Sequence, residues 1–501
     1  MIEQHAIALV VVVPLLAAPL CVLTGRGRGA WTVATAAIWS TFALALHLVQ
    51  RVLTEGPISY AMGGWEPPVG IEFRLDAAGA LVMLVITGIA TIVAPYARKS
   101  IEREVDDFRQ HRFYACLLLC LCGLLGMTIT ADAFNLFVCL EISSLSTYAI
   151  VAMGRDRRAF TAAFRYLLIG TVGATFYLLG IGFLYMLTGT LNMADMAERL
   201  VQPAWDGEGL VHQTRTARAA FAFLTVGLSL KIAIWPLHLW LPNVYAYAPS
   251  AVSAFLSATA TKVAVLVLLR MFYLADGIAM PFSALPLADT LVPLALIGAI
   301  GTSILAIYQE DLKRALAYSS VAQVGYIVLG IGLASTTGLS ASLLHLFNHA
   351  LMKGALFCAM GCIVYRVGST RIAAVRGVGR MMPWTTAVLI LGGLSLIGVP
   401  LTAGFTSKWA LITAILEQER WLTAALMLVS SLLAIIYVGR IIGIVLLAKR
   451  PRGAPQVDEA PIWMVAPTLV LALLNLYFGI ASDTSSELAM SAAQALEEVA
   501  R

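Results

Sequence analysis

Five charged side chains fall inside long apolar stretches of the sequence, and their types could do chemistry there. They are Glu141, Lys231, Lys262, Lys353 and Lys408. A charged side chain at the centre of a bilayer costs about 2.5 to 3.5 kcal/mol, so such residues are usually retained for a function. A lysine near a helix end can instead extend to the membrane surface, an alternative that applies most to Lys262 and Lys408. We interpret the five as groups that bind and release protons inside a membrane.

The balance of these charges favours proton exchange over permanent charge. With all five groups ionised, four positive charges and one negative charge leave a net charge of +3 in an apolar medium, which desolvation opposes. Some of the lysines must therefore be neutral part of the time. Burial favours the neutral form of a lysine, and a nearby carboxylate favours its charged form. Glu141 is the only acid of the five, and we expect it to pair with Lys231.

Two histidines and one of these lysines recur at the spacing of a helix face. His345, His349 and Lys353 stand at i, i+4 and i+8, which places about 6 Å of helix rise between neighbours on one face. Imidazoles titrate near neutrality and can pass protons. Zinc sites also use histidines at i and i+4, but they need a third ligand, and a lysine one turn on repels the cation. The stripe therefore predicts a proton relay between more distant lysines, and we expect no metal site.

The elements that carry these residues are predicted to be membrane-spanning helices. The chain has 501 residues, of which 60% are hydrophobic and 12% charged, with a mean hydropathy of +0.86. A helix needs about 20 apolar residues to cross a bilayer, and about fourteen stretches of that length follow one another. We therefore expect an all-α polytopic membrane protein without a soluble domain. The predicted spans begin at Ala6, Ala30, Leu75, Phe113, Ala133, Ala162, Ala219, Ser250, Leu287, Ala315, Ala341, Pro383, Leu422 and Pro461.

A short internal repeat marks two of these spans. Gly227–Leu230 in the seventh span recurs as Gly393–Leu396 in the twelfth, and a proline follows each copy, Pro236 or Pro400. Proline removes a backbone donor and frees the carbonyl four residues earlier, so the helix must bend or break. Free carbonyls are tolerated at membrane depth only where protein or water covers them. A plain proline kink is the alternative, but two matched positions with a lysine nearby favour broken helices along a polar path.

The distribution of basic residues predicts the orientation of the chain. Loops rich in Lys and Arg stay cytoplasmic, and alternate loops of this sequence differ in that respect. With an even number of spans, the bias places both termini in the periplasm, outside a bacterial inner membrane. The net charge of +5 thus reflects topology, and we expect no nucleic-acid partner. The rich set is Arg26, Arg28, Arg98, Lys99, Arg103, Arg109, Arg112, Arg155, Arg157, Arg158, Lys313, Arg314, Arg366, Arg371, Arg376, Arg380, Lys449, Arg450 and Arg452; the poor set is Arg51, Arg74, Arg199, Arg215, Arg218, Arg270, Arg420 and Arg501.

The seven cysteines lie in or at the edges of apolar stretches, and we interpret them as small hydrophobic residues. Two pairs share a helix face, but neither has further Cys or His ligands nearby for zinc or an iron–sulfur cluster. The sequence also lacks a glycine-rich dinucleotide motif after a strand. These absences weigh against a subunit that itself binds quinone or a redox cofactor. A purely structural scaffold has no use for five buried charges, and we expect no bound cofactor.

Five long motifs follow one another along the chain. They are FNLFVCLE ending at Glu141, KIAIWPLHLWLPNVYAYAPSAVSAFLSATATKVAV from Lys231, DLKRALAYSS from Asp311, HLFNHALMKG from His345 and GLSLIGVPLTAGFTSKW from Gly393. Together they resemble the antiporter-like subunits shared by respiratory complex I, membrane-bound hydrogenases and Mrp-type Na+/H+ antiporters. Within that family, GGWEPPVGIEFRLDAAGALV from Gly63 is most similar to the D subunit of the Mrp antiporters.

The resemblance implies a fold of fourteen helices with two inverted five-helix repeats and interrupted seventh and twelfth helices. We accordingly expect a three-helix segment over residues 1–112, repeats over 113–275 and 287–448, and a last helix with a short tail over 449–501. The resemblance also implies roles for the charged residues in proton uptake, relay and final transfer. These fall to the pair Glu141 and Lys231, to the relay Lys262, His345, His349 and Lys353, and to the terminal carrier Lys408, respectively.

The function implied by the resemblance is that of an ion transporter subunit rather than an enzyme. It is a proton-translocating subunit of a multisubunit monovalent cation (Na+)/H+ antiporter. The alternative is a proton-pumping membrane subunit of a complex I-like NADH:quinone oxidoreductase or a membrane-bound hydrogenase, and related modules of bicarbonate-accumulating complexes also stay open. In each case the expected partners are other membrane subunits, lipid and protons.

Overall fold

The computed structural model describes residues 2–204, 209–274, 286–451 and 456–498 of the chain. Arg452 and Arg501 of the predicted basic sets lie outside these residues, as do the predicted repeat limit at residue 275 and parts of segment 449–501. The helices are α1 (Ile2–Leu23), α2 (Gly27–Glu55), α3 (Ala77–Glu104), α4 (Asp107–Ile129), α5 (Ala133–Ala152), α6 (Arg157–Thr188), α7 (Met193–Leu200), α8 (Arg215–Ile232), α9 (Leu241–Tyr247), α10 (Ser250–Phe272), α12 (Leu287–Ile307), α13 (Leu312–Gly332), α14 (Thr336–Val367), α15 (Ile372–Val375), α16 (Pro383–Ile397), α17 (Ala403–Glu417), α18 (Trp421–Ile442), α19 (Ile462–Ile480) and α20 (Asp483–Glu498). Two strands, β1 (Ile58–Ala61) and β2 (Glu72–Leu75), pair antiparallel.

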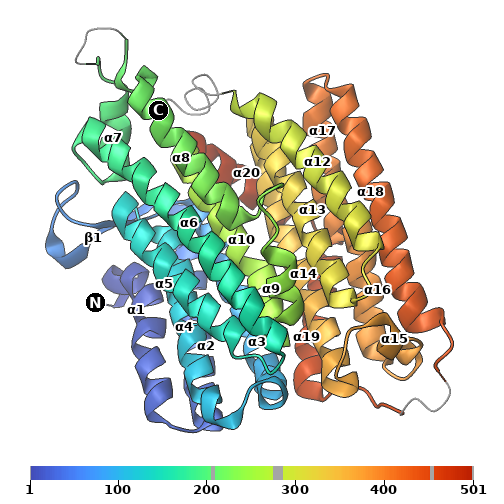
Figure 1. Ribbon diagram of the computed structural model, residues 1–501. Coiled ribbons are helices and arrows are strands. Elements are labelled where there is room, and N and C mark those ends of the chain that lie inside the picture. The colour runs from blue at the N-terminus through green and yellow to red at the C-terminus, as the bar shows by residue number, and fades with distance from the viewer. Residues whose placement is uncertain (1, 205–208, 275–285, 452–455, 499–501) are drawn as a thin grey trace.

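The long helices pack side by side into one bundle (Figure 1). Among the described residues, 12 helices are long and apolar enough to cross a membrane. The two other predicted spans are the interrupted ones, α8 with α9 and α16 with α17. The expectation of an all-α polytopic membrane protein is therefore confirmed, with a small β-hairpin between α2 and α3 that the sequence did not predict.

Short polar residues set where several of these helices begin. The side chains of Asp76, Asp132, Asp156, Asp311 and Ser335 each accept a hydrogen bond from a backbone N–H in the first turn of the helix that follows. Such caps satisfy donors that the helix itself leaves free. They also explain why α6 and α14 begin before the predicted starts, because hydropathy detects the apolar middle of a span and misses its polar first turn.

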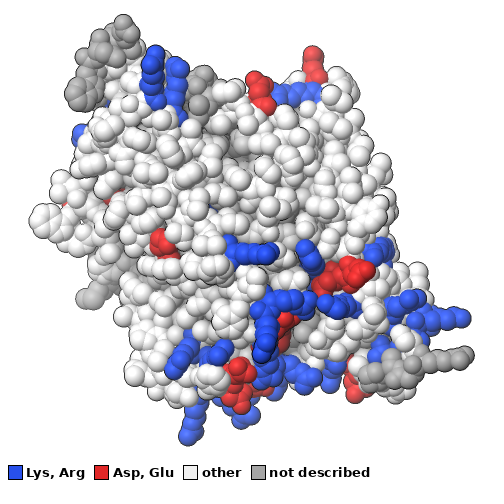
Figure 2. Space-filling model, viewed as in Figure 1, with Lys and Arg blue, Asp and Glu red and all other residues white. Residues whose placement is uncertain are grey.

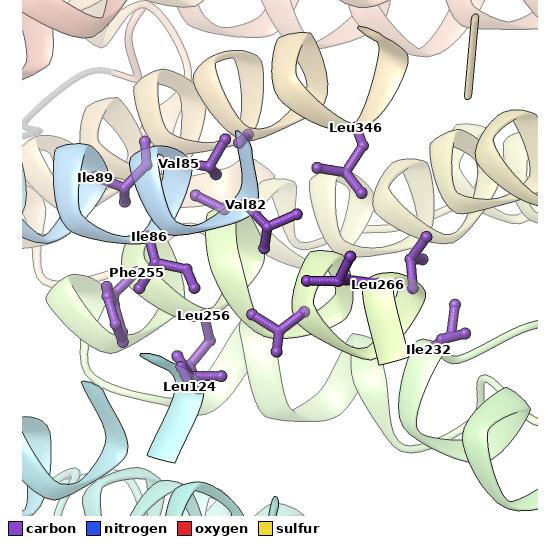
Figure 3. Close-up of a cluster of buried hydrophobic side chains, with 14 of the residues drawn as sticks. Val82, Val85, Ile86, Ile89, Leu124, Ile232, Phe255, Leu256, Leu266 and Leu346 are labelled. Carbon is purple, nitrogen blue, oxygen red and sulfur yellow. The ribbon is translucent and has the colours of Figure 1, made fainter. Parts of the chain in front are cut away.

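The centre of the bundle is built on α10 and α13, which are the most buried of the candidate spans, with α4 and α14 next. Apolar side chains from α3, α4, α8, α10 and α14 fill the space around α10 (Figure 3). Small residues bring other helices together. A Cβ on Gly227 would lie 2.6 Å from the carbonyl oxygen of Gly173, so α6 and α8 can approach this closely only with glycine there.

Both interrupted spans break where the repeat and its proline predicted. Helix α8 ends at Ile232, and Ala233 adopts a left-handed conformation with φ of 66°. Helix α16 ends at Ile397, and Gly398 adopts the same conformation with φ of 91°. At the first break the indole Nε1 of Trp240 donates to the carbonyl of Leu230 at 2.9 Å. The uncovered backbone is thus bonded within the protein, as the membrane interior requires.

A buried ion pair joins three helices near the end of α10. The Arg270 guanidinium lies 3.3 Å from Asp76, the cap of α3, and the side chains of both are 8% exposed. Arg270 also donates to the carbonyls of Met127, Thr128 and Thr130 at the end of α4. The pair therefore neutralises a carboxylate and satisfies carbonyls that α4 leaves free.

The short tail predicted after the last span contains a further helix, α20. Helix α20 packs against α3 and α14 in the upper part of the bundle (Figure 1). The hydroxyl of Thr336, in the first turn of α14, donates to the carboxylate of Glu497 at 2.8 Å. Ala489, Ala492 and Ala493 are buried in this packing.

Basic side chains gather at one end of the bundle. Figure 2 shows Lys and Arg concentrated at the lower end on this face and sparse at the upper end. The lower end contains the loops between α1 and α2 and between α5 and α6 (Figure 1). These belong to the basic-rich set of the sequence.

Candidate functional site

The predicted charged residues lie on the central helices and on the interrupted spans. Lys262 on α10 and Lys353 on α14 are completely buried, as are His345 and His349 on α14. Lys408 on α17 is buried as well. Glu141 on α5 and Lys231 on α8 are only partly buried, so this end of the set is open to the surface of the chain.

The ammonium group of Lys231 binds hydroxyls rather than the carboxylate that we expected. Its Nζ donates to Ser144 Oγ at 2.7 Å and lies 3.5 Å from the Tyr148 hydroxyl. Among the described residues no ion pair joins Lys231 to Glu141, whose buried Oε1 has no hydrogen-bond partner. The two groups therefore do not touch, although the carboxylate lies close enough to Lys231 to act on its charge. The reason is that Ser144 and Tyr148 lie one and two turns beyond Glu141 on the same face of α5, and the lysine extends toward them.

The two fully buried lysines are held by neutral acceptors. Lys353 Nζ donates to Ser319 Oγ at 2.5 Å and to the carbonyl of Leu316 at 3.0 Å, both on α13. Lys262 Nζ donates to the carbonyl of Ser257 and lies 3.4 Å from Thr261 Oγ1. Hydrogen bonds of this kind compensate part of the cost of burying an ammonium group.

Lys408 bonds the backbone carbonyls at the end of α16, where the second interrupted span breaks. Its Nζ donates to the carbonyls of Leu396 and Ile397 at 2.8 and 3.1 Å, and to Ser431 Oγ at 3.2 Å. Leu396 carries the carbonyl that the sequence predicted Pro400 would free. One and the same lysine is therefore a candidate proton carrier and the group that satisfies the broken end of α16.

The histidine stripe connects to Lys408 through one tyrosine. The rings of His349 and His345 are parallel within 2°, with centroids 6.1 Å apart. His345 contacts the ring of Tyr326 edge-on at 5.6 Å, and Lys408 Nζ lies 4.9 Å from the centre of that ring. His345 Nδ1 is also 2.9 Å from the hydroxyl of Ser407, the neighbour of Lys408. His349, His345, Tyr326 and Lys408 thus form one buried row, in which Nε2 of His345 and both ring nitrogens of His349 have no hydrogen-bond partner among the described residues.

The hydroxyl partners suit groups that gain and lose a proton. A hydroxyl can accept from an ammonium and can donate to a neutral amine, whereas a carboxylate only accepts. Lys231, Lys353 and Lys408 each contact at least one hydroxyl. Among the described residues, none of these three lysines forms an ion pair with a carboxylate. The arrangement can therefore hold both protonation states with little rearrangement.

The comparisons with known proteins decide the family. Residues 130–434, more than half of the chain, match the family described as "NADH:quinone oxidoreductase/Mrp antiporter, TM". The chain belongs to this family.

Relatives within the NADH:quinone oxidoreductase/Mrp antiporter family are of both kinds. The chain is 40% identical over 500 residues to the N subunit of the NADH-quinone oxidoreductase of Desulforudis audaxviator, with 96% of each chain covered. It is 26% identical to the D subunit of the Na+/H+ antiporter of Alkalihalophilus pseudofirmus, with 88% of this chain and 86% of that protein covered. In the structure of the Mrp complex from Dietzia, one chain superposes with a TM-score of 0.88 at 25% identity, covering 99% of this chain and 98% of that one.

These relationships confirm the family that the motifs indicated. The protein is a multi-pass, transporter-type membrane subunit, and its partners are other membrane subunits. The two kinds of relative leave the assembly open, because the antiporter relative and the oxidoreductase relative are both similar along nearly the whole chain.

Sequence reasoning in this family found the charges and missed their hydroxyl partners. Ser144, Tyr148, Ser319, Tyr326 and Ser431 contact the lysines but were not predicted. For Ser144, Tyr148 and Ser319 the signal was present in the Ser- and Thr-rich runs EISSLSTY and AYSS inside apolar spans. Such runs indicate little on their own, because serine often bonds its own helix.

One buried lysine was interpreted only as a loop residue. Lys313, in the first turn of α13, is buried and donates to the carbonyl of Ala248 at 2.7 Å. Because it follows Asp311 closely at the end of an apolar span, the sequence placed it with the topology-determining charges. Its contact instead ties the start of α13 to the end of α9.

Proposed function

We propose that this chain carries protons through the membrane along its buried lysines and histidines, as a subunit of a multisubunit monovalent cation (Na+)/H+ antiporter. The observation that carries the proposal is the buried row of side chains in which His349, His345, Tyr326 and Lys408 follow one another through ring contacts. Burying titratable groups at membrane depth lowers the stability of a protein, so a series of them is expected to serve a function. Proton transfer is the function that such a series can perform.

Protons reach this series from the partly buried end of the set. In the proposal Lys231 and Glu141 take up the proton, because both are partly open to the surface of the chain. Lys262 then passes it to His349 and Lys353, whose charges lie close enough to interact with one another. Lys408 is the final carrier.

The step from Lys231 to Lys262 has no direct contact between described side chains. Lys231 faces α5 through Ser144, whereas Lys262 faces its own helix α10. Transfer at this step therefore requires water or movement of the Lys231 side chain.

A second candidate is a proton-pumping membrane subunit of a complex I-like oxidoreductase. The relative named as the N subunit of NADH-quinone oxidoreductase, at 40% identity over 500 residues, favours it. The proton path proposed here is the same in both cases. Only the source of the driving force differs, a cation gradient in one and electron transfer in partner subunits in the other.

One experiment separates the two candidates. The chain is purified from its native membranes through an affinity tag, its partner subunits are identified by mass spectrometry, and the complex is reconstituted into liposomes. Proton movement driven by a Na+ gradient supports the antiporter, and proton movement driven only by electron transfer supports the oxidoreductase. A Lys231→Ala complex that pumps at the wild-type rate under either drive overturns the proton path itself.

We also infer the topology and the internal division of the chain. The basic loops support an orientation in a bacterial inner membrane with both termini in the periplasm. The paired breaks support two five-helix units, over residues 113–275 and 287–448, after a three-helix segment over 1–112 and before the last helix and tail over 449–501. A fluorescent protein fused to the C-terminus, which matures only in the cytoplasm, tests the orientation. Bright cells contradict it.

A further inference from the structure

A basic cavity opens on the outer surface of the bundle. Its volume is about 330 Å³, and it lies between the start of α6, helix α9 and the start of α13. Arg158 and Arg165 of α6, Arg314 of α13 and Tyr247 of α9 line it. Figure 2 shows basic side chains gathered at the lower end of this face, where α6 begins in Figure 1.

Two of the three arginines form no ion pair with a described acidic residue. Arg158 pairs with Asp156 at 2.6 Å and lies over the ring of Tyr247 at 4.5 Å. Arg165 has no ion pair or hydrogen bond among the described residues, and the buried Nε of Arg314 has no hydrogen-bond partner. No described acidic residue lines the cavity. The cavity is therefore electrostatically incomplete and suits an anion.

The nearby acid Asp311 does not compensate these charges directly. Its carboxylate accepts from the Thr370 hydroxyl at 2.8 and 2.9 Å and from the backbone N–H of Arg314 at 3.0 Å. Its oxygens are thus committed to the start of α13 and to the loop before α15. A second anion has to come from outside the chain.

The depth of the cavity corresponds to the membrane surface. Helix α6 has 32 residues and is about 48 Å long at 1.5 Å per residue, which exceeds the bilayer core of about 30 Å. Arg165 is eight residues into the helix, about 12 Å from its start. This position falls near the boundary between lipid headgroups and acyl chains.

The surface next to the cavity is apolar and faces outward. Phe164 is 59% exposed, Leu168 is 52% exposed and Val172 is 49% exposed, all on α6 on the side away from the start of the helix. A cationic cavity thus continues directly into an apolar helix face. This combination is complementary to an amphiphile that has an anionic head and an apolar tail.

We propose that the cavity binds the phosphate of an anionic phospholipid, whose acyl chains lie along the outer face of α6. Arginine recognises phosphate through two parallel N–H donors, and basic pockets between membrane helices are typical sites for anionic headgroups. A free phosphate would occupy the cavity but would make no contact with the apolar face of α6. An acidic side chain of a neighbouring subunit fills only the cationic part and is the alternative to be tested.

Native mass spectrometry of the purified protein in detergent tests the proposal. The protein is titrated with phosphatidylglycerol, and with phosphatidylcholine as the uncharged comparison. The test variants are Arg165→Gln and the double variant Arg165→Gln with Arg314→Gln. Arg28→Gln is the matched control, because Arg28 is also an exposed arginine at the basic end but lies outside the cavity. Thermal unfolding measurements check that each variant is folded. If the double variant does not fold, the single variant Arg165→Gln still tests the proposal, because Arg165 is exposed.

The proposal expects specific loss of the anionic lipid. Phosphatidylglycerol affinity should fall about tenfold or more in the double variant and less in Arg165→Gln, and should change less than twofold in Arg28→Gln. Equal affinity in wild type and in Arg165→Gln, with the double variant unchanged or unfolded, overturns the proposal. So does displacement of the lipid by an equal concentration of glycerol phosphate or inorganic phosphate, which identifies a free-anion site. Cross-linking of the cavity to an acidic residue of a partner in the purified complex also overturns it.

Discussion

Removing one hydroxyl next to Lys353 should slow proton transfer strongly. In the described residues the Lys353 ammonium has two acceptors, Ser319 Oγ at 2.5 Å and the Leu316 carbonyl at 3.0 Å. Ser319→Ala deletes the first and leaves the second. The change creates only a small space, because serine and alanine differ by one oxygen atom.

The size of the effect follows from the lost hydrogen bond. A hydrogen bond to a charged group contributes about 1.5 to 3 kcal/mol, and a tenfold change in an equilibrium corresponds to about 1.4 kcal/mol. The ammonium form of Lys353 should therefore be populated about 10 to 100 times less. If protons pass through that form in the slow step, the transport rate falls by the same factor.

The assay measures acidification of liposomes that contain the assembled complex, with a pH-sensitive dye and an immunoblot for the amount of each variant. Ser320→Ala is the matched control, because Ser320 is the adjacent buried serine and bonds only the Leu316 carbonyl. It should change the rate less than twofold, and Ser319→Thr, which keeps the hydroxyl, should retain most of it. An unchanged rate in Ser319→Ala, or an equal loss in Ser320→Ala, would refute the reasoning.

Three further outcomes are expected. Glu141→Ala and Lys231→Ala should each abolish transport while the protein stays in the membrane at wild-type level; a proton flux like that of wild type in either variant contradicts the uptake role. Arg270→Met should lower the stability of the chain by about 3 to 5 kcal/mol, because it leaves Asp76 as a buried, unpaired carboxylate, and an unchanged melting temperature in detergent argues against this. The isolated chain in liposomes should show no Na+-dependent proton exchange, since four lysines at membrane depth repel a metal cation, and exchange at the rate of the full complex would require a Na+ path near Glu141.

The positions of the helices were predictable because lipid imposes a simple rule on sequence. Each span must be apolar for its whole length, so the spans and the unusual charges within them stand out together. The two breaks were predictable for the same reason. A proline beside a repeated Gly-Leu-Ser-Leu leaves carbonyls that lipid cannot satisfy, and α8 and α16 end within two residues of these repeats.

The contacts of the charges were not predictable to the same degree. We expected Lys231 to find the only buried acid of the five, yet it binds Ser144 and Tyr148. Charge pairing is a long-range preference, whereas the partner actually reached depends on side-chain length and on which turn of α5 faces α8. The burial of Lys313 was missed because its position in sequence, at the end of a span, is the same for a loop lysine and for one that bonds Ala248.

The two breaks differ in what holds them, and this difference has a mechanical consequence. At the first, the Leu230 carbonyl is held by the indole of Trp240, which stacks on Tyr166 with ring centroids 4.1 Å apart and carries no charge that it could lose. At the second, all three N–H bonds of the Lys408 ammonium are in use, two on the carbonyls of α16 and one on Ser431. A neutral amine has only two N–H bonds. Loss of the proton therefore removes one of the three hydrogen bonds, unless the Ser431 hydroxyl turns and donates to the amine instead. The hydrogen bond that holds the first break is therefore independent of protonation. The hydrogen bonds that hold the second break weaken when Lys408 loses its proton.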